Sequence, residues 1–101
     1  MTISGGEELR LIGLCQQGDS SALESLVISH MGLVKYWVRR ILVVATWADP
    51  EDMTQEGVIG LIEAIKNFDP LKAERLSNYA HNYIRGRIFR SPDFRRNLRR
   101  Y

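Results

Sequence analysis

The chain has 101 residues, a formal net charge of +2 and hydrophobic residues at 45% of its positions, which is typical of one compact domain. Its single cysteine, Cys15, excludes an internal disulfide and a cysteine-rich metal site. We expect no metal at His30 or His81, because neither has further ligands nearby in the sequence. The N-terminus lacks the order of a signal peptide, and the most hydrophobic stretch, residues 26–47, contains three basic residues. We therefore expect a cytoplasmic protein without a membrane span.

The charge is divided unevenly along the chain. Residues 1–84 hold seven Lys/Arg and eleven acids, a net charge of −4, whereas residues 85–101 hold seven arginines and one acid, a net charge of +6. Such a division predicts two different partners, of which one is a polyanion.

The hydrophobic periodicity predicts an all-α fold, a small bundle of about four helices followed by a short basic C-terminal segment. No window alternates apolar and polar residues with period two. The first expected helix covers residues 7–17 and is ended by Gly18. A long helix then begins with Asp19 or Ser20 as its cap and runs to about Val44.

Two further helices follow from clear start and stop signals. Asp49 is a natural cap and Pro50 suits the first position of the helix that follows. Pro70 ends that helix, because proline disfavours helical geometry at the preceding residue. After a loop, Ser77 is expected to cap a last helix that runs to about Arg90.

The helix that begins after Asp49 has two distinct sides. One is an apolar, core-facing stripe of Met53, Val58, Leu61, Ala64, Ile65 and Phe68. The opposite side is acidic and consists of Asp52, Gln55, Glu56 and Glu63 around Ile59, with Ile62 at its margin. This side suits a basic and partly apolar partner; a solvated surface with one exposed apolar residue explains it equally well.

The last helix combines three kinds of side. Its narrow buried stripe is Ala80, Ile84 and Ile88; a second side holds Tyr79, Tyr83 and Arg90; and a third holds Asn78, Asn82, Arg85 and Phe89. Aromatics, amides and guanidinium groups together can stack on unpaired bases, hydrogen-bond to base edges and neutralise phosphates. Either tyrosine alone is better explained by packing against a neighbouring helix. The pair beside seven arginines favours nucleic acid, although an Arg-rich tail also suits acidic proteins or membranes.

Both helices carry motifs of a known family. The matching pattern is Asp52-x-x-Gln55-Glu56-Gly57-x-Ile59-Gly60-Leu61, then Ala64, Phe68-Asp69, and Ser77-x-Tyr79-Ala80-x-x-x-Ile84-Arg85. It resembles the conserved second region of bacterial RNA polymerase sigma factors, most closely the flagellar and sporulation type, over about residues 7–95.

This resemblance implies a single domain over residues 1–101, with a flexible N-terminus (1–6), a helical core (7–90) and a basic tail or linker start (91–101). It implies transcription initiation without enzymatic activity, catalytic residues, metal or cofactor. Core RNA polymerase would be bound, through the clamp helices of its largest subunit, by Asp52, Gln55, Glu56, Ile59 and Ile62. The −10 promoter element would be recognised and melted, through capture of its non-template strand, by Asn78, Tyr79, Asn82, Tyr83, Arg85, Gly86, Phe89 and Arg90. An anti-sigma factor is a further implied partner, and a membrane is not.

The chain departs from the family pattern at informative positions. Asn82 stands where housekeeping members have tryptophan, Asn78 replaces a usual threonine, and Arg87 replaces a small residue at the edge of the buried stripe. Fewer aromatics imply weaker or more selective melting. The alternative function is that of a sigma-like regulator, which binds polymerase or an anti-sigma factor without melting DNA. An enzyme has no support, since Gly57 and Gly60 are better explained by close helix packing than by a phosphate loop. The length suits either an excised domain or a standalone subunit.

Overall fold

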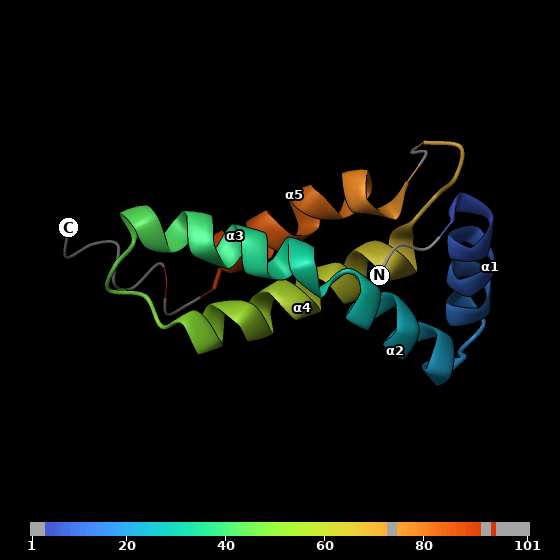
Figure 1. Cartoon of the computed structure of the whole chain (residues 1–101), viewed down its shortest axis with the longest axis horizontal. Helices are drawn as coiled ribbons and strands as arrows, with labels where there is room; N and C mark the ends of the chain where they lie inside the picture. The colour runs from blue at the N-terminus through green and yellow to red at the C-terminus, as the bar shows by residue number, and fades with distance from the viewer. Residues whose placement is uncertain (1–3, 73–74, 92–93, 95–101) are drawn as a thin grey trace.

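The computed structural model describes residues 4–72, 75–91 and 94, and this part of the chain contains five α-helices and no strand (Figure 1). The helices are α1 (Gly5–Gln16), α2 (Ser20–Ser29), α3 (Met31–Val44), α4 (Pro50–Asn67) and α5 (Leu76–Phe89). The predicted all-α fold class is confirmed. Of the predicted basic tail, only Ser91 and Phe94 lie within the described residues. No helix of the described ranges has both the length and the hydropathy that crossing a membrane requires.

Helix α4 lies at the centre of the bundle and contacts each of the other four helices. In Figure 1, α3 and α5 run along α4 in the opposite direction, and α1 lies across the end of the bundle where α4 ends and α5 begins. Among the described residues, the side chains with no exposed surface include Glu8, Leu26, Val34, Leu61, Ala64, Ile65, Leu76, Ala80, Ile84 and Ile88. The stripes predicted for α4 and α5 form the core, except that Val58 is half-buried at its edge.

Local capping rules account for most helix ends. Asp19 Oδ1 accepts a hydrogen bond from Ala22 N at 3.0 Å, and Asp49 Oδ1 accepts one from Glu51 N at 2.9 Å. Pro50 occupies the first position of α4, as predicted. Gly18 follows α1 with φ +101°, a conformation that favours glycine. Helix α1 begins at Gly5, two residues earlier than expected, because Ser4 Oγ accepts from Glu7 N at 3.2 Å.

The long helix predicted to run to Val44 is wrong, because the chain breaks at His30 into α2 and α3. The carbonyl of Leu26 accepts hydrogen bonds from three groups: His30 N at 3.2 Å, His30 Nδ1 at 2.8 Å and Ser29 Oγ at 3.0 Å. Side chains that bond to nearby backbone in this way compete with regular helix. His30 accordingly takes φ −111° and ψ 8°, and the chain changes direction there.

Two glycines of α4 lie at close helix contacts, Gly60 against α5 and Gly57 against α3. A Cβ at Gly60 would lie 2.5 Å from the carbonyl oxygen of Tyr83, and one at Gly57 would lie 2.8 Å from Val34 Cγ1. Only glycine permits the contact at position 60, because the opposing atoms belong to backbone. The interpretation of this glycine pair as a close helix contact is confirmed, and the contact fixes how the predicted polymerase-binding and DNA-binding helices sit against each other.

Candidate protein-binding and nucleic-acid surfaces

The side of α4 predicted to bind polymerase is partly open to solvent. Asp52, Gln55 and Ile59 are exposed, Ile59 with 40% of its surface accessible, whereas Glu56 and Ile62 are half-buried. An apolar side chain among polar ones is thus available to a partner, and burying its exposed part would contribute about 1 kcal/mol.

Arg87 of α5 neutralises part of this acidic side. Its Nε lies 2.8 Å from Glu56 Oε2, and one terminal nitrogen lies 3.7 Å from Glu63 Oε1. The hydrogen bond that Arg87 donates to Glu56 raises the pKa of Arg87 above its ordinary value. The arginine keeps 38% of its side chain exposed, as expected for a stem at the edge of the core. Two of the acids counted from the sequence are therefore already paired within the chain.

Tyr79 and Tyr83 form a joined pair on α5. Their ring centroids are 5.2 Å apart, and both rings are half-buried. The Tyr79 hydroxyl donates to the Asn67 carbonyl at 3.1 Å, so Tyr83 must donate to Tyr79 across their 3.1 Å contact. Phe68 packs edge-on against Tyr79 at 5.6 Å. The tyrosines thus have structural partners in addition to any ligand.

The remaining residues predicted to contact DNA lie beside this pair, mostly exposed. Asn78, Asn82, Arg85, Phe89 and Arg90 are exposed, and Gly86 is half-buried. Arg85 donates to Asn82 Oδ1 at 2.9 Å, which holds both polar groups on one side of the helix. Phe89 lies edge-on to Phe94 at 5.2 Å. Helix α5 therefore presents amide, guanidinium and aromatic groups together.

A contact between α3 and α5 was not predicted from the sequence. Trp37 Nε1 donates to His81 Nδ1 at 2.8 Å, so the hydrogen of a neutral His81 ring lies on Nε2. Arg85 lies over the Trp37 ring at 5.3 Å. The hydrophobic periodicity of a single helix does not show which residues of two helices will meet. The only signals in the sequence were a tryptophan within α3 and a histidine within α5.

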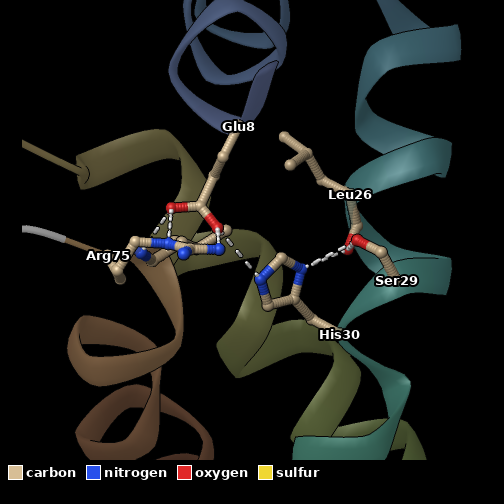
Figure 2. A network of polar contacts seen from close by, with 6 residues as sticks. Glu8, Leu26, Ser29, His30 and Arg75 are labelled. Atoms are coloured by element: carbon tan, nitrogen blue, oxygen red, sulfur yellow. Dashed lines mark hydrogen bonds and ion pairs between the residues drawn. The ribbon is translucent and has the colours of Figure 1, made fainter. Parts of the chain in front are cut away.

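The most important unpredicted residue is Glu8, whose side chain has no exposed surface. Figure 2 shows its carboxylate between α1, α2 and α5, where it accepts from the amide of Leu76 at 2.9 Å and from Arg75 Nε at 3.2 Å. His30 Nε2 lies 3.5 Å from its other oxygen. The predicted cap Ser77 is wrong: α5 begins at Leu76, and the carboxylate that caps it comes from α1.

Gln16 caps the neighbouring helix end from the same element. Its Nε2 donates to the carbonyls of Ile65 and Phe68, each at 3.1 Å, at the C-terminus of α4, where the last carbonyls lack partners in a following turn. Glu8 and Gln16 are two to three turns apart on α1. This helix therefore holds both sides of the connection between the two helices that carry the predicted binding residues.

Two further features bear on the chemistry. A cavity of about 230 Å³ lies at the start of α4, lined by Trp47, Ala48, Asp49, Asp52, Met53, Ser91 and Phe94. Within the described residues, no three His, Cys, Asp or Glu side chains lie close enough to hold a metal ion. The arrangement favours recognition by charge, hydrogen bonding and stacking.

Comparison with known proteins agrees with this geometry. Residues 26–100 match the Sigma-70 region 2 family. The RNA polymerase sigma-28 factor of Bacillus thuringiensis subsp. kurstaki is 33% identical over 86 residues, which are 85% of this chain and 35% of that protein. The sigma-E factor of Clostridium acetobutylicum is 34% identical over 86 residues, again 85% of this chain and 36% of that protein. The sigma-H factor of Bacillus licheniformis is 32% identical over 82 residues, 81% of this chain and 36% of that protein.

The chain spans about a third of the length of these three relatives. The family match contains α3, α4 and α5 entire, and with them every residue predicted to bind polymerase or DNA. The family match covers about three quarters of the chain, and the fold is all-α. The chain therefore belongs to the Sigma-70 region 2 family.

Proposed function

We propose that this chain acts in transcription initiation as a non-enzymatic module that binds core RNA polymerase and captures the non-template strand of the −10 promoter element. The observation that carries the proposal is the juxtaposition on α5 of the Tyr79–Tyr83 pair with the exposed Asn82 and Arg85. A base can stack on an aromatic pair, and the neighbouring polar groups can hydrogen-bond to the edge of that base or to its phosphate. The sigma factor names of the relatives support the same role. Such a module works in the cytoplasm.

Base capture supplies the energy for local melting in this proposal. Extruding a base costs a few kcal/mol, and stacking it on an aromatic side chain returns about 1–3 kcal/mol. Arg85 on the same helix and Arg90, the residue that follows it, add phosphate contacts, which release counterions. No nucleotide hydrolysis is needed. Because Asn82 and Asn78 bring amides rather than aromatic rings, we expect this module to open fewer promoter sequences than an aromatic-rich relative.

The stacking role predicts different effects for two substitutions of one residue. Tyr79→Leu removes the ring, and we expect it to weaken binding of a fluorescent single-stranded −10 oligonucleotide, in the presence of core polymerase, by about 5- to 150-fold. Tyr79→Phe keeps the ring and loses only the hydroxyl contacts to Asn67 and Tyr83. It should retain most of the affinity and lose about 1 kcal/mol of stability. Equal affinity for both variants would show that the ring does not hold a base.

Polymerase docking is tested best at Ile59, because Glu56 already pairs with Arg87. Ile59→Ser removes the exposed apolar group at the centre of the predicted surface, and we expect it to weaken binding to core polymerase by about fivefold. Ile28→Ser is the matched control: Ile28 is 65% exposed on α2, outside the predicted surface. Titration of labelled chain with core polymerase measures both. An equal loss for the two variants, or none for Ile59→Ser, would contradict this docking surface.

A sigma-like regulator that does not melt DNA is the second candidate. It is favoured by the engagement of both tyrosine hydroxyls within the fold. The two functions differ in one result. A regulator binds core polymerase through α4 but gives no gain in affinity for the −10 oligonucleotide, whereas a promoter-melting module gives that gain and loses it with Tyr79→Leu.

A further inference from the structure

A second group of aromatic and basic side chains lies beside the predicted DNA surface, on a helix to which no binding role was assigned. We call it the α3–α5 ridge and define it as Tyr36, Trp37, Arg40, His81 and Arg85. Tyr36 is 45% exposed, and Arg40 and Arg85 are exposed as well. The exposed part of the ridge on α3 is thus an aromatic ring with an arginine one turn further on.

Ring contacts make the ridge continuous between the two helices. Tyr36 lies edge-on to Trp37 at 5.3 Å and to His81 at 6.3 Å. Trp37 in turn donates a hydrogen bond to His81, and the Arg85 guanidinium lies over the Trp37 ring. Arg85 also bonds to Asn82, a predicted DNA contact. An occupant that follows the exposed side of α5 therefore meets Tyr36 and Arg40 next.

Within the part of the chain that the structure describes, no carboxylate pairs with the arginines of the ridge. Helices α3 and α5 contain no acidic residue. Among the described residues, Arg10 pairs with Glu7 and Arg87 with Glu56, whereas Arg40 and Arg85 form no ion pair with any described acid. Instead Arg40 lies over the Tyr36 ring at 5.5 Å and Arg85 over the Trp37 ring. Guanidinium groups held on rings, with no anion of their own, are placed to receive an external one.

We propose that the DNA surface continues from α5 across the α3–α5 ridge, where Arg40 binds a backbone phosphate and Tyr36 stacks on an unpaired base. The occupant is the single strand that α5 captures, so this inference rests on the proposed function. Stacked aromatics interleaved with arginines are the composition of sequence-tolerant single-strand sites. An acidic protein would form ion pairs with Arg40, but its carboxylates would not stack on the ring of Tyr36.

Two adjacent arginines of α3 provide a matched test. Arg40 belongs to the ridge, whereas Arg39, also exposed, points about 100° away around the helix. With core polymerase and a fluorescent single-stranded oligonucleotide that extends beyond the −10 element on both sides, we expect Arg40→Ala to lower affinity about fivefold. It should also reduce the salt dependence, the slope of log K against log salt, by about 0.7. Arg39→Ala should change affinity less than about twofold, since salt screens charges beyond about 8 Å.

Tyr36 separates a nucleic-acid occupant from an acidic protein. Tyr36→Leu should lower affinity about fivefold or more, with Tyr36→Phe close to the original chain. If Arg40→Ala and Arg39→Ala had equal effects, or if Tyr36→Leu had no effect, the proposal that the α3–α5 ridge binds DNA would be contradicted. If Tyr79→Leu still weakens binding in that case, the proposed function stands and only the extension onto α3 is wrong. If the unsubstituted chain gives polymerase no added affinity for the oligonucleotide, both proposals fail together.

Discussion

Replacing Gly60 by alanine (Gly60→Ala) is expected to lower the free energy of unfolding by about 3 kcal/mol, although alanine is the better helix former by about 1 kcal/mol. The added Cβ would lie 2.5 Å from the Tyr83 carbonyl oxygen, 2.9 Å from its carbon and 3.0 Å from Ile84 Cα. All three are backbone atoms of a packed helix and cannot turn aside as a side chain can. Helices α4 and α5 would have to separate. Thermal unfolding followed by circular dichroism should show a melting temperature about 12 °C lower or more.

Gly13→Ala is the matched control for this prediction. Gly13 also lies inside a helix, but a Cβ there would meet no atom within 4 Å. It should therefore leave stability unchanged or raise it by up to about 1 kcal/mol. Gly57→Ala should fall between the two, because its nearest neighbour is the side chain of Val34. If Gly60→Ala and Gly13→Ala melted alike, the close approach of α4 and α5 would be contradicted.

Glu8→Ala is expected to have the second large effect, a loss of about 3 kcal/mol in the free energy of unfolding. It leaves the buried Leu76 amide without its acceptor and removes the carboxylate that faces Arg75 and His30. Glu8→Gln can still offer one oxygen to Leu76 and should lose less. Urea unfolding measures the stability. Under native conditions, the first amides of α5 should exchange their hydrogens faster in the variant than in the original chain, because this end of the helix opens locally without unfolding of the whole domain.

The neighbouring glutamate serves as the control. Glu7 pairs with Arg10 on the surface of α1, where solvent screens the ion pair. We expect Glu7→Ala to change stability little and to leave exchange at the start of α5 unaltered. Equal behaviour of the Glu7 and Glu8 variants would show that the carboxylate of Glu8 does not cap α5.

Local rules predicted the parts of the fold that depend on neighbouring residues. Asp19, Asp49 and Pro50 were recognised because a cap and the turn it serves are adjacent in sequence. The buried stripes of α4 and α5 were recognised because their periodicity repeats over several turns. The break at His30 was missed, since a hydrophobic pattern crosses it while the competing side-chain hydrogen bonds give no periodic signal.

Contacts between distant segments could not be predicted in the same way. Glu8 and Leu76 are 68 positions apart, and only the packed bundle brings them together. One signal was present: Glu8 lies one turn before Leu11 and Ile12, on the side of α1 that is buried. A carboxylate on an apolar face requires a partner, but the sequence does not say which. At the candidate site, the helical periodicity of α5 placed Asn82 and Arg85 away from its buried stripe, and both residues are exposed.

Helix α1 lies upstream of the residues that the family model matches, but it belongs to the same folded unit. The family match begins at residue 26, yet Gln16 holds the last carbonyls of α4 and Glu8 holds the first amide of α5. Both groups lie upstream of the match. The alignments with the sigma-28 and sigma-E relatives, each over 86 residues, also extend upstream of residue 26. A chain shortened to the residues of the family match would keep the residues predicted to bind polymerase and DNA. It would lose the helix whose side chains join the end of α4 to the start of α5.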